Sequence, residues 1–239
     1  MILSHVLFHR HTPWQSEIRC STNIFASLFQ QAGDHVTYMH GMINPGHVVT
    51  HKGRYHYWRK GPRREHGAWV FTPLSMVPYS RVWPFDQPAA ARLAYQSCIP
   101  SIKSQVLASG EGEPDVIWTA NPGSTALRHA FPRARLVFQV VDYYPAFSGN
   151  AIKQIERRDY EEADHILVIG ETLKRYIMDE HGIDAARITV LGQGVFTENY
   201  RPDLPVPDDI AQLPHPLAIW VGVNSKCDPA MFRSAAAHM

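Results

Sequence analysis

The sequence has no long hydrophobic run, few cysteines and almost no net charge. No apolar stretch among its 239 residues approaches the ~18–20 residues that span a bilayer. The cysteines, Cys20, Cys98 and Cys227, are far apart and odd in number, which suits reduced thiols in the cytoplasm better than a disulfide framework. With 23 Lys+Arg against 22 Asp+Glu, the net charge of +1 argues against nucleic-acid binding driven by bulk charge.

Phosphate-binding and metal-binding motifs are also missing. No GxGxxG follows an expected strand and no GxxxxGK[ST] occurs, so neither a dinucleotide fingerprint nor a P-loop is present. His9 and His11 lie two residues apart, but only Glu17 is near enough in sequence to add a ligand. We therefore expect neither a metal site nor a bound cofactor, and the remaining histidines, 14 in all, show no pattern.

Short apolar runs alternate with helical stretches along most of the chain. Residues 41–88 are the exception, with strand-like pieces only at 55–58 and 69–71. Strands separated by helices imply βαβ crossovers, so we expect an α/β fold with a mostly parallel sheet and helices on both faces. The expected strands are 2–8, 35–39, 115–119, 135–141, 165–169 and 187–191, and the expected helices are 21–31, 89–108, 124–130, 151–162 and 171–181.

A proline-rich stretch marks a domain boundary. Residues 197–216 contain five prolines and no apolar periodicity, as an interdomain linker does. Beyond it, 217–223 has the pattern of a buried strand, and Asp228 followed by Pro229 is typical of a helix start. We expect one whole domain over 1–196 and, over 217–239, the first strand and helix of a second domain that continues past Met239.

The loops after the strands hold the candidate site, because ligands of open α/β sheets bind beyond the carboxyl ends of the strands. Asp142 follows one such strand and is placed to accept a proton from a substrate hydroxyl, unless it is a solvated loop residue or a cap. Tyr143 and Tyr144 either stack on a sugar or pack internally. The glycines around Gln193 either let the backbone approach a ligand or form a turn. The candidate binding residues after the first strand are Thr12, Trp14, Gln15, Arg19 and Asn23.

A local basic and aromatic segment stands out in this neutral protein. It covers residues 51–66, and Trp69, Phe71, Trp83 and Phe85 follow it. A solvated loop, a nucleic-acid contact and a site for an acidic substrate are alternatives, but the aromatic residues favour contact with an anionic membrane surface. Its cations are Lys52, Arg54, Arg59, Lys60, Arg63 and Arg64.

Residues 160–195, with the following strand, resemble a glycosyltransferase of the GT-B type. The resemblance rests on YEEADHILVIGETLKRYIMDEHGIDAARITVLGQGV, which looks like the close of the acceptor domain, and on PLAIWVGV, which looks like the opening of the donor domain. It implies two Rossmann-like domains facing each other across a cleft. The residues it places at the donor side of the cleft are Gly192, Gln193, Gly194 and Gly222.

Within that fold, the chain is most similar to the xanthan-pathway β-glucuronosyltransferase family. The similarity rests on Thr12-Pro13 with Arg19 and Asn23, on 135–138 leading into Asp142, on 192–195, and on Val221-Gly222 followed by 227–229 and Phe232. It implies that Asp142 is the general base. Two features depart from the pattern: Gln193 replaces a histidine of the family, and a glycine-rich first loop is absent.

The resemblance implies a metal-independent, inverting transfer of a sugar, with glucuronate as the candidate, from a UDP-linked nucleotide sugar to a lipid-linked or polysaccharide acceptor, as in exopolysaccharide biosynthesis. The protein would act in the cytoplasm, on the inner face of the membrane, and the 239 residues alone would be inactive without a donor domain. Two alternatives stay open. One is a retaining GT-B transferase with another donor, in which Asp142 only orients the acceptor; the other is a non-catalytic saccharide- or membrane-binding module.

Overall fold

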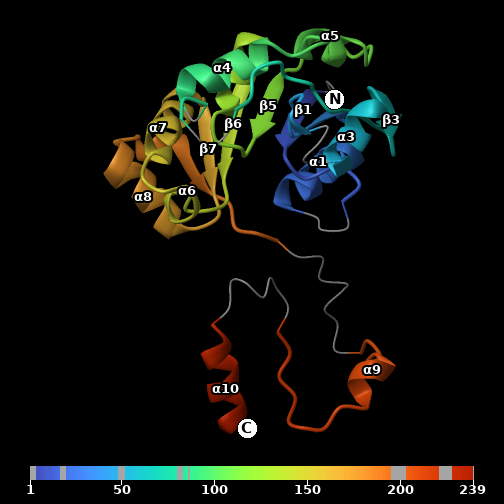
Figure 1. Cartoon of the computed structure of the whole chain (residues 1–239), viewed down its shortest axis with the longest axis vertical. Helices are drawn as coiled ribbons and strands as arrows, with labels where there is room; N and C mark the ends of the chain where they lie inside the picture. The colour runs from blue at the N-terminus through green and yellow to red at the C-terminus, as the bar shows by residue number, and fades with distance from the viewer. Residues whose placement is uncertain are drawn as a thin grey trace. The chain divides into compact units, whose positions relative to one another are not determined.

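The chain forms two compact units (Figure 1). The computed structural model describes residues 4–16, 20–47, 52–79, 83–85, 87–194, 203–220 and 228–238. The first unit, Met1–Gln193, contains the sheet, and the second unit is Gly194–Met239. No helix in the described parts of the chain is long and apolar enough to cross a bilayer.

One eight-stranded sheet forms the centre of the first unit, counted over the described residues, in the order β3-β4-β2-β1-β5-β6-β7-β8. All neighbours are parallel except β3 and β4. From β1 the chain moves outward through β2 to β4 and then returns to β5 on the other side of β1, so the strand order reverses between β1 and β5. The strands are β1 (His5–Arg10), β2 (His35–His40), β3 (Arg63–Glu65), β4 (Ala68–Phe71), β5 (Val116–Thr119), β6 (Arg135–Val140), β7 (His165–Val168) and β8 (Ile188–Val190).

Helices cover both faces of the sheet, because alternate strand residues point to opposite sides. On β1, Val6 and Phe8 pack in one apolar cluster with Ala26, whereas Leu7 packs in another with Leu127. The expected α/β, Rossmann-like architecture is therefore confirmed. The helices of this unit are α1 (Ser21–Gln31), α3 (Lys52–Arg59), α4 (Pro88–Gln96), α5 (Ile102–Leu107), η1 (Ser124–His129, a 3-10 helix), α6 (Pro145–Ser148), α7 (Ile152–Glu162), α8 (Glu171–His181) and η2 (Ala185–Arg187, 3-10).

Three expectations between residues 41 and 130 were wrong. The aromatic piece at 55–58 lies in helix α3, where the rings of Tyr55 and Trp58 stack at 5.4 Å across one turn. The helix expected over 89–108 is two helices, α4 and α5, because the residue before Pro100 disfavours helical backbone and a proline has no N–H. The helix expected over 124–130 is the 3-10 helix η1.

In the second unit, the expected helix start is confirmed. Asp228 Oδ1 accepts a hydrogen bond from the Ala230 N–H at 2.9 Å, and Pro229 occupies the first turn of α10 (Pro229–Ala237). A short helix, α9 (Asp208–Ala211), interrupts the proline-rich stretch. The strand expected over 217–223 does not form in its described part, 217–220, and the remainder lies outside the described residues.

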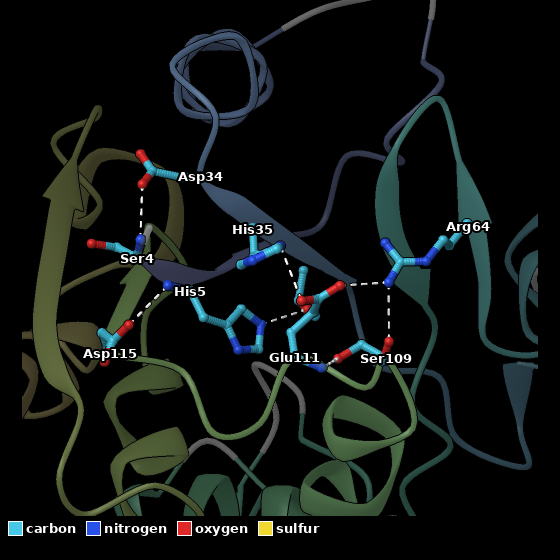
Figure 2. Close-up of polar contacts among 9 residues, drawn as sticks. Ser4, His5, Asp34, His35, Arg64, Ser109, Glu111 and Asp115 are labelled. Carbon is cyan, nitrogen blue, oxygen red and sulfur yellow. Dashed lines mark hydrogen bonds and ion pairs between the residues drawn. The ribbon is translucent and has the colours of Figure 1, made fainter. Parts of the chain in front are cut away.

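At the amino-terminal ends of the strands, polar groups of the chain pair with one another (Figure 2). The Ser4 N–H donates to Asp34 at 3.0 Å, and the His5 N–H donates to Asp115 at 2.8 Å. Glu111 contacts His35 at 3.0 Å and Arg64 at 2.6 Å, and this arginine holds the pKa of the Glu111 carboxyl below its usual value. The carboxyl-terminal edge is different, because a cavity lies there.

Candidate functional site

A cavity of about 470 Å³ lies at the carboxyl ends of five strands. Its position includes the point between β1 and β5 where the strand order reverses, which is where ligands bind in open α/β sheets. Its volume falls within the range of small-molecule sites. After β1 it is lined by Arg10, His11 and Thr12; after β2 by Met42, Ile43, Asn44 and His47; from α3 by Arg54; after β4 by Ser75, Val77 and Tyr79; after β5 by Ala120, Asn121 and Pro122; and on the β6 side by Tyr144, Ser148, Ala151, Ile152 and Ile155, with Tyr95 from α4.

The carbonyl of Ala120 joins the two sides of the reversal point. Arg10 Nη1 and the Tyr144 hydroxyl each donate to this oxygen at 2.8 Å. Burial raises the pKa of Tyr144 above its usual range; the nearby Arg10 charge opposes this shift and Asp142 adds to it. Tyr144 is therefore a neutral hydrogen-bond donor at the cavity, and Arg10 brings a positive charge to the end of β1.

His9, on β1 next to the cavity-lining residue Arg10, is fully buried. Its Nδ1 faces the Met39 carbonyl at 3.0 Å and its Nε2 faces the Tyr95 hydroxyl at 2.9 Å. A carbonyl only accepts, so Nδ1 carries the proton and Nε2 accepts from Tyr95. Burial lowers the pKa of His9 to about 4. The ring is a neutral structural link between β1, β2 and α4, and both its nitrogens are occupied.

The loop after β1 is held by buried side chains. The Tyr38 hydroxyl donates to the Thr12 carbonyl at 3.0 Å, and the Trp14 N–H donates to His40 Nε2 at 3.1 Å. Asn23 is 2% exposed and donates to the Pro13 carbonyl at 3.2 Å. Of the residues predicted here to bind acceptor, Thr12 lines the cavity, while Trp14 and Asn23 position the loop. Gln15 is exposed, and Arg19 lies outside the described residues.

Asp142 and Tyr143 follow β6 on the surface. Asp142 is exposed and is not among the residues that line the cavity. Tyr143 is 44% exposed, and its ring packs against Tyr176 edge to face at 4.8 Å. Of this predicted group only Tyr144 lines the cavity.

The predicted donor-side glycines lie elsewhere. Gly192, Gln193 and Gly194 follow β8, are exposed, and do not line the cavity. Gly222 lies outside the described residues. Their part in donor binding stays a prediction.

The basic segment is divided among different environments. Arg54, on α3, lines the cavity, whereas Arg63 pairs with Glu65 at 2.6 Å and Arg64 pairs with Glu111. Arg59 and Lys60 are exposed, and the side chain of Lys52 lies outside what the structure describes. The charge of the segment is therefore less concentrated than its sequence suggests.

The aromatic segment was partly misassigned to the surface. Phe71 is fully buried, and Trp69 packs against the same core and donates from Nε1 to the Gln105 carbonyl at 2.9 Å. Both follow the inward pattern of the buried strand β4, so neither forms an interface. Trp83 and Phe85 are exposed, at 77% and 37%.

Asn121 is a site residue to which sequence analysis gave no role. It follows β5 directly, lines the cavity and is 3% exposed, yet its Nδ2 has no hydrogen-bond partner in the structure. Its position at a strand end was the available signal. Within the described residues, no three His, Cys, Asp or Glu side chains gather as metal ligands would.

Comparison with known proteins identifies a family. The glycosyl transferase 4-like domain matches residues 36–194, a range that runs from the second residue of β2 through β8 and contains most of the residues that line the cavity. No curated protein sequence matches the chain, and the narrower resemblance to the xanthan-pathway β-glucuronosyltransferases gains no support. The sheet, the cavity beyond its carboxyl ends and the matched domain agree, and the chain belongs to the glycosyl transferase 4-like family.

Proposed function

We propose that the first unit binds the acceptor in a transferase that moves a sugar from a nucleotide sugar, UDP-linked, to a hydroxyl of a saccharide. The observation that carries this proposal is the cavity at the reversal point of the sheet in a chain of glycosyltransferase family. Its lining combines apolar side chains with hydroxyls, an amide and guanidinium groups, the mixture that orients a sugar. Nucleotide-sugar binding is assigned to residues outside this cavity, including the predicted Gly192 and Gly194.

We further propose that the transfer proceeds with retention of the anomeric configuration. Members of this family are typically retaining, and Asp142 is exposed outside the cavity lining. An inverting reaction requires a base on the face opposite the leaving nucleotide, whereas front-face attack has no such requirement. Asp142 then orients the acceptor at the mouth of the cavity, and the inverting reaction with Asp142 as base is the competing hypothesis.

Asp142→Asn is expected to lower kcat by about tenfold at most, because the amide keeps an oxygen for orientation while losing basicity. The variant is compared with the wild-type protein for transfer from UDP-sugars, and the anomeric configuration of the product is determined. Loss of a true general base would cost about 10²–10⁴-fold. A loss of that size together with an inverted product would establish the competing mechanism. A properly folded protein that neither binds nor transfers any nucleotide sugar would support a non-catalytic module instead.

For the acceptor we propose a lipid-linked saccharide at the inner, anionic face of the membrane, with glucuronate as the candidate donor sugar. The exposed Trp83 and the exposed cations Arg59 and Lys60 support this assignment, since aromatic and basic side chains favour an anionic lipid interface.

Trp83→Ser is expected to weaken binding to vesicles that contain anionic lipid by at least about threefold, because a large aromatic side chain contributes strongly at an interface. Co-sedimentation with anionic and neutral vesicles measures this, and Phe147→Ser, which removes another exposed aromatic ring at 52% exposure, is the matched control. Equal binding to both vesicle types would contradict the membrane assignment and leave the transferase assignment intact.

A further inference from the structure

We propose that the cavity contains a subsite for a phosphate or carboxylate group carried by the acceptor, formed by Asn121, Arg10 and Arg54. Its assignment to the acceptor rests on the proposed function, whereas the anion site itself rests on the geometry below.

The charge lining the cavity is of one sign. Arg10 and Arg54 both line it, and none of its described lining residues is Asp or Glu. Arg10 donates to a neutral carbonyl, that of Ala120, and no ion pair joins either guanidinium to a carboxylate among the described residues. By contrast, Arg63 and Arg64, from the same basic segment, are both paired with glutamates. Two arginines left without carboxylates at a cavity favour an anionic ligand, because guanidinium groups match the geometry of phosphate and carboxylate oxygens.

Asn121 supplies an unsatisfied donor at the same place. Its side chain is nine-tenths or more buried, at 3% exposure, and Nδ2 has no hydrogen-bond partner in the structure. A buried amide donor without a partner is costly, and such groups in native proteins call for an explanation. The residue immediately before it, Ala120, is the one to which Arg10 donates. The missing acceptor of Asn121 and the uncompensated charge of Arg10 therefore meet at the end of β5.

Hydrogen bonds hold the backbone around Asn121. Its carbonyl accepts from the Ser124 N–H at 3.1 Å and from the Ser124 hydroxyl. Two residues on, the Gly123 N–H donates to Asp159 at 2.6 Å. Gly123 has a φ of +83°, and a Cβ there would lie 2.7 Å from the Tyr79 hydroxyl oxygen, so this turn requires glycine. These bonds fix the backbone that carries the Asn121 side chain, and a fixed backbone favours a preorganised donor.

These features define the class of ligand. An oxyanion accepts from the Asn121 amide and from the guanidinium groups, and a cavity of about 470 Å³ leaves space for a sugar ring attached to it. We therefore assign the acceptor to phosphorylated or uronic-acid saccharides. The backbone of Asn121 and the side chain of Arg10 are each held by a hydrogen bond at this end of the sheet.

The test uses four probes and a pair of matched arginines. Glucose 1-phosphate, glucuronate, glucose and inorganic phosphate are titrated calorimetrically into the 239-residue chain. The variants are Arg54→Gln and Arg59→Gln. Both arginines are exposed residues of α3, and each change removes one positive charge, but only Arg54 lines the cavity. The third variant is Asn121→Asp, which replaces the unpaired amide donor with a negative charge that repels an anionic ligand.

We expect at least one anionic sugar to bind about tenfold or more tightly than glucose, because charge-assisted hydrogen bonds are the strong ones. Arg54→Gln and Asn121→Asp should each abolish most of that preference, while Arg59→Gln changes it by less than about twofold, since exposed charges are screened by salt. Whether glucose 1-phosphate or glucuronate shows the preference identifies the anion.

Three results would overturn the proposal: equal affinities for glucose and both anionic sugars, equal effects of Arg54→Gln and Arg59→Gln, or inorganic phosphate binding as tightly as glucose 1-phosphate. The last would mean that the site takes a free anion and not a sugar-borne one. Failure of the proposed function is seen separately, as absence of UDP-sugar transfer while the anion preference of this cavity persists.

Discussion

Replacement of His40 by Gln is expected to make the unfolding free energy of the first unit less sensitive to acid, by about 1.4 kcal/mol per pH unit between pH 6 and pH 4. The cause is a buried ring that cannot be protonated in place. The Trp14 N–H donates to His40 Nε2 at 3.1 Å, so Nδ1 must carry the proton that faces Thr72 at 2.9 Å. A proton on Nε2 would set two donors against each other.

The direction of this pH dependence follows from the pKa values of His40 in the folded and unfolded chains. Burial lowers the pKa of His40 to about 3, whereas a histidine in the unfolded chain has its ordinary pKa of 6.5. Between these values the unfolded chain binds a proton that the folded chain does not. The stability due to neutral His40 is therefore fully present above pH 6.5 and is lost as the pH falls towards 3. His9, with a pKa lowered by burial to about 4, and His5, whose pKa is also lowered by burial, act in the same direction.

Asp159 provides a control of opposite sign. Burial raises its pKa from 3.8 to about 7, although bonds from Thr125 and Gly123 oppose that shift. Between pH 4 and pH 7 the folded state therefore binds the extra proton, and this contribution to stability is complete below pH 4 and is lost as the pH rises through 7. Asp159→Asn is accordingly expected to make the protein more sensitive to acid, where His40→Gln makes it less so.

Urea unfolding, followed by tryptophan fluorescence at several pH values between 4 and 7, measures how the unfolding free energy of each variant depends on pH. His129→Gln, at an exposed position of η1, tests for a general effect of removing a histidine. Slopes that are identical in wild type and His40→Gln would show that the ring is protonated without loss of its contacts.

These histidines also show what sequence could not provide. Their number was visible, but their roles depend on the register of neighbouring strands. His5 bonds Thr37 and His9 bonds the carbonyl of Met39, both on β2, and each partner becomes a neighbour only when β1 and β2 pair. A search for metal-ligand spacing was the wrong test for side chains that join strands.

The strands that are buried on both faces were predictable, because their sequences are continuous apolar runs. The strands near 116–119, 135–140 and 165–168 and the helix Glu171–His181 agree with their expected positions to within a residue or two. Between β2 and β5 the strand-like piece expected at 69–71 is confirmed as β4. The rest of this segment was not predictable, because its short helices and the edge strand β3 carry little periodicity. There the aromatic rings of α3 imitated a strand, although they stack along a helix.

The site was predictable to the level of strand ends and no further. Asp142, at the end of β6, is exposed, while Asn121, at the end of β5, is buried with an unpaired amide. Both residues follow a strand directly, so their positions along the chain gave equal reason to place either one in the site. The difference lies in the turn after β5, which is closed by Ser124 and Asp159, and the partner Asp159 is 38 residues away on helix α7.

Asp159→Ala is expected to destabilise the first unit by about 2–4 kcal/mol, since each buried donor left unsatisfied costs about 1–3 kcal/mol. The carboxylate is 1% exposed and accepts from the Gly123 N–H and the Thr125 hydroxyl, both at 2.6 Å. For a domain of this size the melting temperature should fall by about 5–15 °C. Asp159→Asn keeps one acceptor oxygen but turns a donor towards the other partner, so about half of this loss is expected at pH 7.

Glu161→Ala, two residues along α7 at an exposed position, is the matched control and should change the melting temperature by no more than about 2 °C. An Asp159→Ala variant as stable as this control would mean that the turn does not depend on the carboxylate. Because that turn fixes Asn121, loss of Asp159 should also weaken the cavity's preference for anionic sugars in protein that remains folded, measured by the same calorimetry. A drop in stability with the preference unchanged would confine Asp159 to the fold. Loss of both would show that helix α7, whose residues in the cavity lining are uncharged, nevertheless sets the position of the unpaired Asn121 amide.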